Sequence, residues 1–213
     1  MCAVIPIWAF IAVTVPLVLM PGASTAVVLK NSIAGGTRAG VETAIGINAG
    51  TFVYGLLTAF GVALVLQQWP SLWGALRAGG TAYLAWLGIK SIRHAFGTHA
   101  PDPRFAAGTV REQAPSGGAQ HVREGFVTNL LNPAIATFYF VVVPQFVPRG
   151  APTVRSVLVL CAIHIAIAAS WHVVWAAAGG TLAATLASGR PRRILDLVAG
   201  VAFIALAARL ALG

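Results

Sequence analysis

A proline interrupts an apolar, membrane-length segment at Leu19-Met20-Pro21-Gly22-Ala23-Ser24-Thr25, and a second proline interrupts another at Thr128-Asn129-Leu130-Leu131-Asn132-Pro133. A proline inside a helix removes one backbone hydrogen bond and clashes with the preceding turn, at a cost of about 3 kcal/mol. In hydrocarbon no water satisfies the freed carbonyl groups, so such a break persists only where protein or a wet cavity satisfies them. Broken spans of this kind often form the solute sites of transporters.

The composition around both breaks is typical of a membrane protein. The chain has 213 residues, of which 58% are hydrophobic and 9% charged, a balance that a soluble domain of this size does not show. A hydrocarbon core of about 30 Å needs about 20 helical residues. The apolar stretches of sufficient length are 6–29, 41–66, 71–92, 124–147, 154–179 and 194–212. We therefore predict an all-α integral membrane protein with six transmembrane helices, of which helices 1 and 4 are broken, in one unit covering residues 1–213.

The basic residues are distributed unequally between the two sides of these predicted spans. The formal net charge is +9. The odd-numbered loops carry Lys30, Arg38, Lys90, Arg93, Arg104, Arg111, Arg123, Arg190, Arg192 and Arg193, and the other side carries Arg77, Arg149, Arg155 and Arg209. This asymmetry places the odd loops in the cytoplasm and both termini outside an inner (plasma) membrane. No basic arm is interleaved with aromatic residues, which argues against nucleic-acid binding.

A hydrophilic segment divides the chain into two halves. Residues 94–122 are rich in proline and glycine and are predicted to be a cytoplasmic linker between residues 1–93 and residues 123–213. Each half contains three spans, and because three is odd, the second half enters the membrane from the opposite side. The parity predicts a 3+3 inverted-topology repeat.

The residues after each break predict a solute site. Ser24 is expected to cap a renewed helix after Gly22, and Asn132 is a favoured N-cap in front of Pro133. Two helix N-termini at similar depth suit a carboxylate, and unwound carbonyl groups suit an ammonium group. An amino acid meets both demands. The alternative is that the prolines are kinks that only help to pack the bundle.

The titratable residues of the span interiors are two histidines of helix 5. No Asp or Glu lies in the interior of a predicted span, since Glu42, Glu124 and Asp196 stand at span ends, so an acidic proton relay at mid-membrane is not expected. His164 is the candidate for proton coupling; the alternative is a neutral imidazole hydrogen-bonded to a neighbouring helix. His172 is expected near the inner interface. His94, His99 and His121 fall in the linker without metal-ligand spacing, so neither a metal site nor a cofactor is predicted.

The second stretch carries Gly46-Ile47-Asn48-Ala49-Gly50 followed by Tyr54 on one helical face. The two glycines form a small-xxx-small pair that lets another helix approach, and packing within the bundle is favoured over a dimer seam. Gly35-Gly36 is predicted to be a turn between helices 1 and 2. Enzyme signatures such as a phosphate-binding loop or a nucleophile elbow do not occur, so an enzyme is not predicted.

Three blocks of sequence resemble the lysine exporter (LysE/RhtB) family of amino-acid efflux proteins. The first is Met20-Pro21-Gly22-Ala23-Ser24-Thr25 with Gly35-Gly36-Thr37-Arg38-Ala39-Gly40 and Gly46-Ile47-Asn48-Ala49-Gly50. The second is Gly79-Gly80-Thr81-Ala82-Tyr83-Leu84-Ala85-Trp86-Leu87-Gly88, and the third is Gly125-Phe126-Val127-Thr128-Asn129-Leu130-Leu131-Asn132-Pro133 with Pro144-Gln145-Phe146. The resemblance covers nearly the whole chain. It implies a six-helix inner-membrane exporter of amino acids or their derivatives that is driven by the proton gradient, and a homodimer is the assembly it suggests.

The chain departs from the family pattern at positions that usually carry a second proline or a charge. Ala23 and Ser24 stand where the family has proline followed by Asp or Asn, Ala134 stands where a lysine often follows Asn-Pro, and Thr51 stands where Asp is common. These replacements leave room for a less charged substrate or for coupling through His164.

Together these observations predict an exporter of a small amino acid or derivative that works by alternating access. The predicted substrate-binding residues are Pro21, Gly22, Ser24, Thr25, Asn48, Thr51, Tyr54, Asn129, Asn132 and Pro133, with a further contact from Tyr83. Two alternatives stay open. A membrane redox conduit would need Cys2 and Cys161 to meet, and a divalent-metal exporter would need ligands from His164 and His172.

Overall fold

The computed structural model describes residues 6–20, 22–68, 70–97, 117–147, 153–186 and 189–212, and every regular element in these ranges is helical. The elements are α1 (Ile7–Leu19), α2 (Ala23–Gln68), α3 (Pro70–Phe96), α4 (Gly118–Leu130), α5 (Pro133–Thr137), α6 (Thr153–Leu186) and α7 (Gly189–Leu212), with a π-helical turn at Phe138–Val142 and a 3₁₀ turn at Val143–Phe146 that continue α5.

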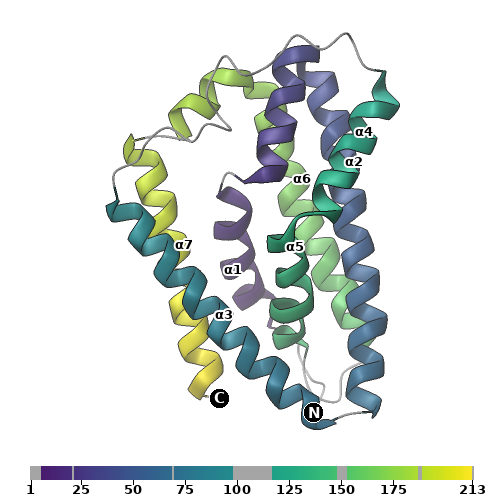
Figure 1. Ribbon diagram of the computed structural model, residues 1–213, viewed down its shortest axis with the longest axis vertical. Coiled ribbons are helices and arrows are strands. Elements are labelled where there is room, and N and C mark those ends of the chain that lie inside the picture. Colours follow the sequence, from purple (N-terminus) through teal and green to yellow (C-terminus); the bar gives the residue numbers. More distant parts are fainter. Residues whose placement is uncertain are drawn as a thin grey trace.

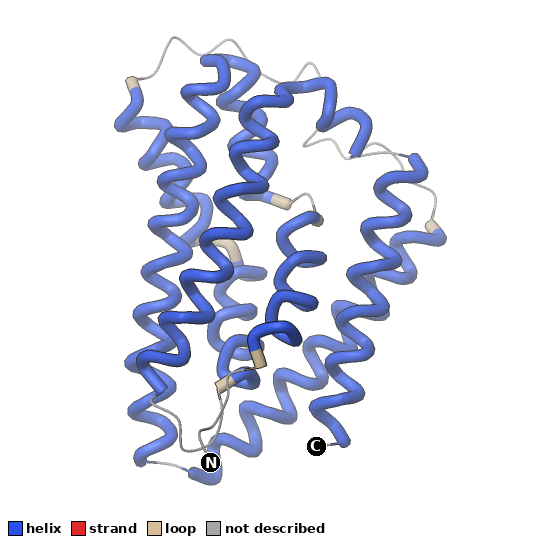
Figure 2. Tube along the Cα trace, turned by 180° about the vertical axis from the view of Figure 1, so that it is seen from behind, coloured by secondary structure: helices blue, strands red, loops and turns tan. Residues whose placement is uncertain are grey.

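The helices form a three-helix bundle, a two-helix arm and a pair of short segments between them (Figure 1). The bundle consists of α2, α4 and α6, and the arm of α3 and α7. The short segments are α1 and α5, which lie between bundle and arm in both views (Figures 1 and 2). Phe10 of α1 packs against Phe138 and Phe146 of the α5 segment, with ring centroids 5.9 and 5.3 Å apart. The centre of the molecule is thus filled by half-length helices that meet each other's aromatic side chains.

Close backbone approach joins the helices within bundle and arm. A Cβ atom on Gly46 of α2 would lie 1.9 Å from the carbonyl oxygen of Val122 in α4, so only glycine fits there. A Cβ atom on Gly88 of α3 would lie 2.9 Å from the carbonyl oxygen of Gly200 in α7. The small-xxx-small pair predicted in helix 2 therefore packs inside the bundle, as expected.

Length and hydropathy make this an integral membrane protein of helical type. Among the described residues, Ala23–Gly61 and Thr153–Ala178 are each long and apolar enough to cross a bilayer, and Gly118–Leu130 with Pro133–Phe146 forms a third span if the bent pair is taken together. The two members of that pair are bent by 55°. α1 has 13 residues, about 20 Å of helix, and does not cross the hydrocarbon on its own.

Both helix interruptions lie where the prolines predicted them. Helix α1 ends at Leu19 and α2 begins at Ala23, with Met20 in an extended conformation between them. Helix α4 ends at Leu130 and α5 begins at Pro133. Asn132 caps α5 with its side chain, which accepts a hydrogen bond from the Ala134 backbone N–H at 3.0 Å, and Pro133 occupies the first turn as predicted. Gly36 has φ of 76°, which confirms the predicted turn between the first and second spans.

Two details of the sequence-based prediction were wrong. Ser24 does not begin the renewed helix: Gly22 precedes it and its carbonyl accepts the first hydrogen bond, from Ala26 N–H at 2.9 Å. The predicted linker 94–122 is helical at both ends, because α3 continues to Phe96 and α4 starts at Gly118; residues 98–116 lie outside the described part of the chain. Both α3 and α4 continue into the predicted linker by a polar turn, and hydropathy does not assign a polar turn to an apolar span.

Candidate functional site

A cavity of about 250 Å³ lies at the centre of the molecule, where the two interruptions meet. Its apolar lining includes Leu17, Val18, Met20, Ile47, Leu87, Ile135 and Phe203. At about 30 Å³ for each water molecule, this volume equals that of about eight waters. It is slightly below the usual size of pockets for drug-like ligands, so it suits a small solute.

Most of the predicted site residues line this cavity. From the predicted set, the structure brings together Gly22, Ser24, Thr25, Thr51, Asn129, Asn132 and His164. These residues come from α2, α4 and α6, from the residue before α2 and from the residue before α5. Two helix breaks that are about 110 residues apart in sequence therefore border one space.

Asn129 occupies the centre of the polar wall. Its side chain is completely buried, and its Nδ2 donates to Thr51 Oγ1 at 3.0 Å. Its Oδ1 accepts from Ser24 Oγ at 3.5 Å, so the amide connects α4 with both limbs of α2. Gly50 makes room for it, because a Cβ there would lie 3.0 Å from Asn129 Nδ2. The Ser24 hydroxyl therefore binds Asn129 in the cavity wall and does not cap the start of α2.

The second interruption is held by a tyrosine that does not line the cavity. The Tyr54 hydroxyl donates to the Leu130 carbonyl oxygen at 2.6 Å. This carbonyl is among the last of α4 and has no partner within that helix. Tyr54 therefore stabilises the break without lining the cavity, whereas the sequence analysis predicts it as a substrate contact.

The cavity lining among the described residues does not include Asn48, Pro133 or Tyr83. Asn48 donates to the Ala44 carbonyl of its own helix at 2.8 Å, and the carbonyl of Pro133 accepts from Thr137 Oγ1 at 2.7 Å. Tyr83 stacks on Trp86 of α3. Pro21 lies outside the described residues.

His164 is buried against two aromatic rings of the α5 segment. It is stacked on Tyr139 with ring centroids 5.5 Å apart and meets Phe138 edge-on at 5.0 Å. Its exposed fraction is 2%, and its Nδ1 has no hydrogen-bond partner in the described part of the protein.

Two cavity residues were missed by the sequence reasoning. His172, expected near the membrane interface, lines the cavity from the same helix as His164; it is 5% exposed and its Nδ1 also lacks a partner within the described residues. An eight-residue spacing, about two helical turns, puts both histidines on one face and was the available signal. Lys90 of α3 also lines the cavity, with its Nζ 4.9 Å from the centre of the Trp86 ring. No local pattern distinguishes it from an interfacial lysine.

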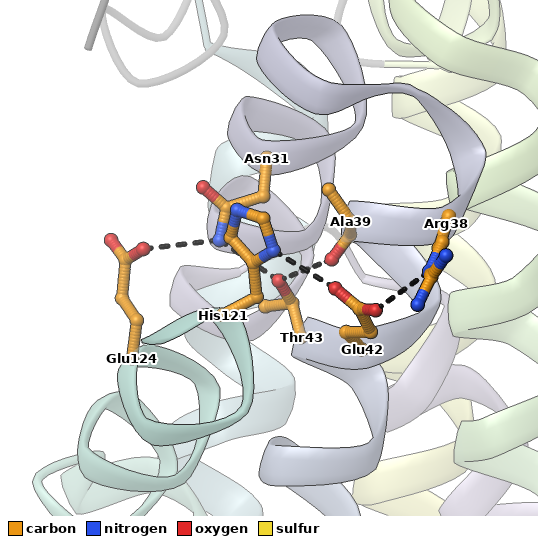
Figure 3. A network of polar contacts seen from close by, with 7 residues as sticks. All are labelled: Asn31, Arg38, Ala39, Glu42, Thr43, His121 and Glu124. Carbon is orange, nitrogen blue, oxygen red and sulfur yellow. Dashed lines mark hydrogen bonds and ion pairs between the residues drawn. The ribbon is translucent and has the colours of Figure 1, made fainter. Parts of the chain in front are cut away.

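A second polar cluster holds the end of the bundle at Gly36 (Figure 3). Lys30 is ion-paired with Glu124, and Asn31 Nδ2 donates to Glu124 Oε2 at 3.0 Å and to Thr43 Oγ1 at 2.8 Å. We call Lys30, Asn31, Thr43 and Glu124 the end cluster. It fastens the first limb of α2 to α4 and to the second limb of α2.

The carboxyl group of Glu42 forms a neighbouring set of polar contacts. Arg38 Nε lies 3.0 Å from Oε1, and His121 Nδ1 lies 3.0 Å from Oε2 (Figure 3). The His121 contact joins α4 to the second limb of α2, next to the end cluster.

Two histidines predicted in the linker belong to helices and pair with acids. His121 in α4 contacts Glu42, and His94 in α3 contacts Asp196 of α7 at 2.7 Å. Both acids are distant in sequence, which is why spacing did not reveal the pairs. In the described ranges no three His, Cys, Asp or Glu side chains gather into a possible metal site. Cys161 is buried beside the Tyr139 hydroxyl, which donates to its sulfur at 3.4 Å, and Cys2 is outside the described residues.

Membrane-length helices, a bent helix pair and a small central cavity at two interruptions define an integral membrane protein of the transporter class. The chain belongs to the LysE type translocator family, whose model matches residues 15–213. It is therefore a transporter and not an enzyme.

Individual relatives agree with this family. The chain is 27% identical to the leucine efflux protein of Salmonella typhimurium over 206 residues, which cover 96% of this chain and 93% of the relative. It is 29% identical to the uncharacterized membrane protein YahN of Escherichia coli over 190 residues, covering 89% and 82%. With the uncharacterized membrane protein YrhP of Bacillus subtilis the identity is 25% over 172 residues, covering 78% and 79%. No solved structure matches the chain.

Proposed function

We propose that the protein is a secondary-active exporter of a small amino acid, or a derivative, with an uncharged side chain. The observation that carries the proposal is the single cavity bordered by both helix interruptions. Its polar wall offers two carboxamides, hydroxyl groups, two imidazoles, the Lys90 side chain and the first turn of α2, while its other surfaces are aliphatic and aromatic. The names of the leucine efflux relatives support an apolar side chain in the solute.

The transporter has six spans in two inverted halves. Span 1 is α1 with residues 23–35, span 2 is the rest of α2, span 3 is α3, span 4 is α4 with the α5 segment, span 5 is α6 and span 6 is α7. The charge asymmetry supports an orientation with the Gly36 end in the cytoplasm and both termini outside.

Alternating access involves residues 23–35 of α2, which we call the inner half-helix. It lies between the interruption that follows Met20 and the Gly36 turn. It carries Ser24 and Thr25 of the cavity wall, and Lys30 and Asn31 of the end cluster attach it to α4. Movement of this segment opens the cavity to the cytoplasm only after the Lys30–Glu124 pair separates.

Proton coupling is assigned to His164. It is a titratable residue of the cavity wall, and a proton on it changes the charge of the space that holds the solute. A His164→Ala variant is expected to lose the pH dependence of export. Export that keeps its normal pH profile would refute this role.

The function is tested in cells that lack their own exporters and are loaded with dipeptides. Expression of the wild-type protein is expected to release one or a few amino acids into the medium, and Asn132→Ala is expected to abolish release while the protein still inserts. The control is Arg93→Gln, an exposed position on α3 outside the cavity. Absence of amino-acid release by inserted wild-type protein, or unchanged release by Asn132→Ala, would refute the proposal.

A further inference from the structure

The titratable groups around the cavity are all basic. Among the described lining residues these groups are Lys90, His164 and His172, and neither Asp nor Glu is among them. The three described acids lie elsewhere and are already engaged: Glu42, Glu124 and Asp196 contact basic side chains. A solute ammonium group therefore finds no carboxylate in the described wall, whereas an anion finds several positive or hydrogen-bonding groups.

The two imidazoles are built into the wall and have hydrogen-bonding capacity to spare. Both are at least nine-tenths buried, and the Nδ1 atom of each lacks a partner among the described residues. A buried polar atom without a partner costs about 1–3 kcal/mol, so such atoms normally serve a ligand or water. An imidazole nitrogen that carries a hydrogen donates to an oxyanion. Each Nδ1 has less than 1 Å² of accessible surface, so the ring turns about its Cβ–Cγ bond when this nitrogen donates to a solute in the cavity.

Lys90 and the start of α2 add positive potential. The Lys90 ammonium contacts the Trp86 ring and is paired with no carboxylate in the described part of the chain. Gly22, Ala23 and Ser24 line the cavity at the beginning of α2. The first backbone N–H groups of a helix have no partner within it, and the helix dipole places partial positive charge there.

We propose that the cavity selects its solute through an anionic carboxylate, received by Lys90, His164 and His172, and that the amino group contributes little to recognition. This inference rests on the proposed function and names its substrate class. The protein then accepts apolar monocarboxylates without an amino group, such as 2-oxo acids, beside the amino acids themselves. It rejects the corresponding amines and amides, which present no anion to the basic wall.

The test measures the thermal stabilisation of the purified, detergent-solubilised protein by four probes of one side-chain shape. These are leucine, its 2-oxo acid, leucinamide and isoamylamine, each titrated to saturation. Leucine and the 2-oxo acid are expected to bind within a few-fold of each other, and the two compounds without a carboxylate about tenfold or more weaker. Equal or tighter binding of isoamylamine, or no stabilisation by either carboxylate, overturns the inference.

A variant set assigns the effect to the basic wall. Lys90→Gln is expected to weaken the 2-oxo acid about tenfold and to leave isoamylamine unchanged, while Lys90→Arg retains the preference. Arg93→Gln, one turn further along α3 and outside the cavity, is the matched control and is expected to behave as wild type. An identical loss in Lys90→Gln and Arg93→Gln, or no loss in Lys90→Gln, contradicts the assignment.

A transport measurement separates this inference from the proposed function. Leucine counterflow in proteoliposomes tests export directly. Carboxylate-selective binding without counterflow of either carboxylate would refute the exporter and leave the selectivity standing. Counterflow that isoamylamine inhibits as strongly as the 2-oxo acid would refute the selectivity and leave the exporter standing.

Discussion

The two helix interruptions differ in how firmly they are held. At the second, Tyr54 binds the Leu130 carbonyl at 2.6 Å, Asn132 caps α5 at 3.0 Å, and the Asn132 N–H donates to the Asn129 carbonyl at 3.1 Å. At the first, the side-chain contacts among the described residues are longer. Ser24 lies 3.5 Å from Asn129, and Ser91 lies 3.9 Å from the Met20 sulfur. We therefore propose that the second break is the fixed point and that the first is the one that moves during transport.

The largest effect is expected where one residue serves both breaks. Asn129→Ala removes the bonds to Thr51 and Ser24 and leaves the buried Thr51 hydroxyl without this partner, at a cost of about 1–3 kcal/mol, and the half-buried Ser24 hydroxyl at a smaller cost. We expect a marked loss of thermal stability and at least tenfold slower counterflow. The control is Thr128→Ala at the preceding position. Full counterflow by Asn129→Ala would show that the amide does not join the two regions.

The next effect tests the fixed break alone. Tyr54→Phe removes the bond to the Leu130 carbonyl, and the unpaired group is expected to cost about 1–3 kcal/mol of unfolding free energy. Denaturation in detergent measures it, with Tyr83→Phe as the matched tyrosine control. If both variants melt together, the second break does not depend on Tyr54.

A smaller effect is expected at the mobile break. The Lys30 and Glu124 side chains are 37% and 34% exposed, so solvent screens their pair to at most about 1 kcal/mol. In Lys30→Gln we expect up to about fivefold faster labelling of a cysteine at position 24 by a membrane-impermeant reagent from the cytoplasmic side. Arg123→Gln, beside Glu124, is the control. Unchanged labelling would mean that the pair does not restrain the inner half-helix.

The smallest effect is expected from adding a methyl group at the mobile break. A Cβ on Gly22 would have the Met20 carbonyl at 4.0 Å as its nearest neighbour, which is ordinary contact. Gly22→Ala is therefore expected to change the unfolding free energy by less than about 0.5 kcal/mol. Gly36→Ala, at a φ of 76°, is expected to cost about 1–2 kcal/mol. A larger loss from Gly22→Ala would show that the first break is tightly packed after all.

Local chemistry explains which features were predictable. Pro133 with Asn132 in front is a helix start wherever it occurs, and Gly35-Gly36 between apolar stretches is a turn. The residues of the polar wall were also largely found, because they lie within a few positions of the two prolines. The cap at the start of α2 was predicted wrongly. Ser24 is a residue type suited to capping, but its hydroxyl donates instead to the Asn129 amide, 105 residues away in sequence.

The apparent linker shows the limit of hydropathy. His94 and His121 lie in polar turns at the ends of α3 and α4, and each reaches an acid in another helix. A low hydropathy marks the end of a span but not the end of a helix. An ion pair between residues this far apart in sequence produces no periodic pattern in the sequence.

The linear order of residues was sufficient for a helical membrane protein with two interrupted segments and polar residues beside each, because helix propensity, capping and burial in lipid act over a few residues. Only the tertiary structure shows that both interruptions border one cavity and that His172 and Lys90 line it. It also shows that Tyr54 binds the carbonyl at the second interruption without lining the cavity. The reason is physical: which face of a helix meets a cavity depends on how closely its neighbours approach, as at Gly46 and Gly50, and that distance is a property of the assembled bundle.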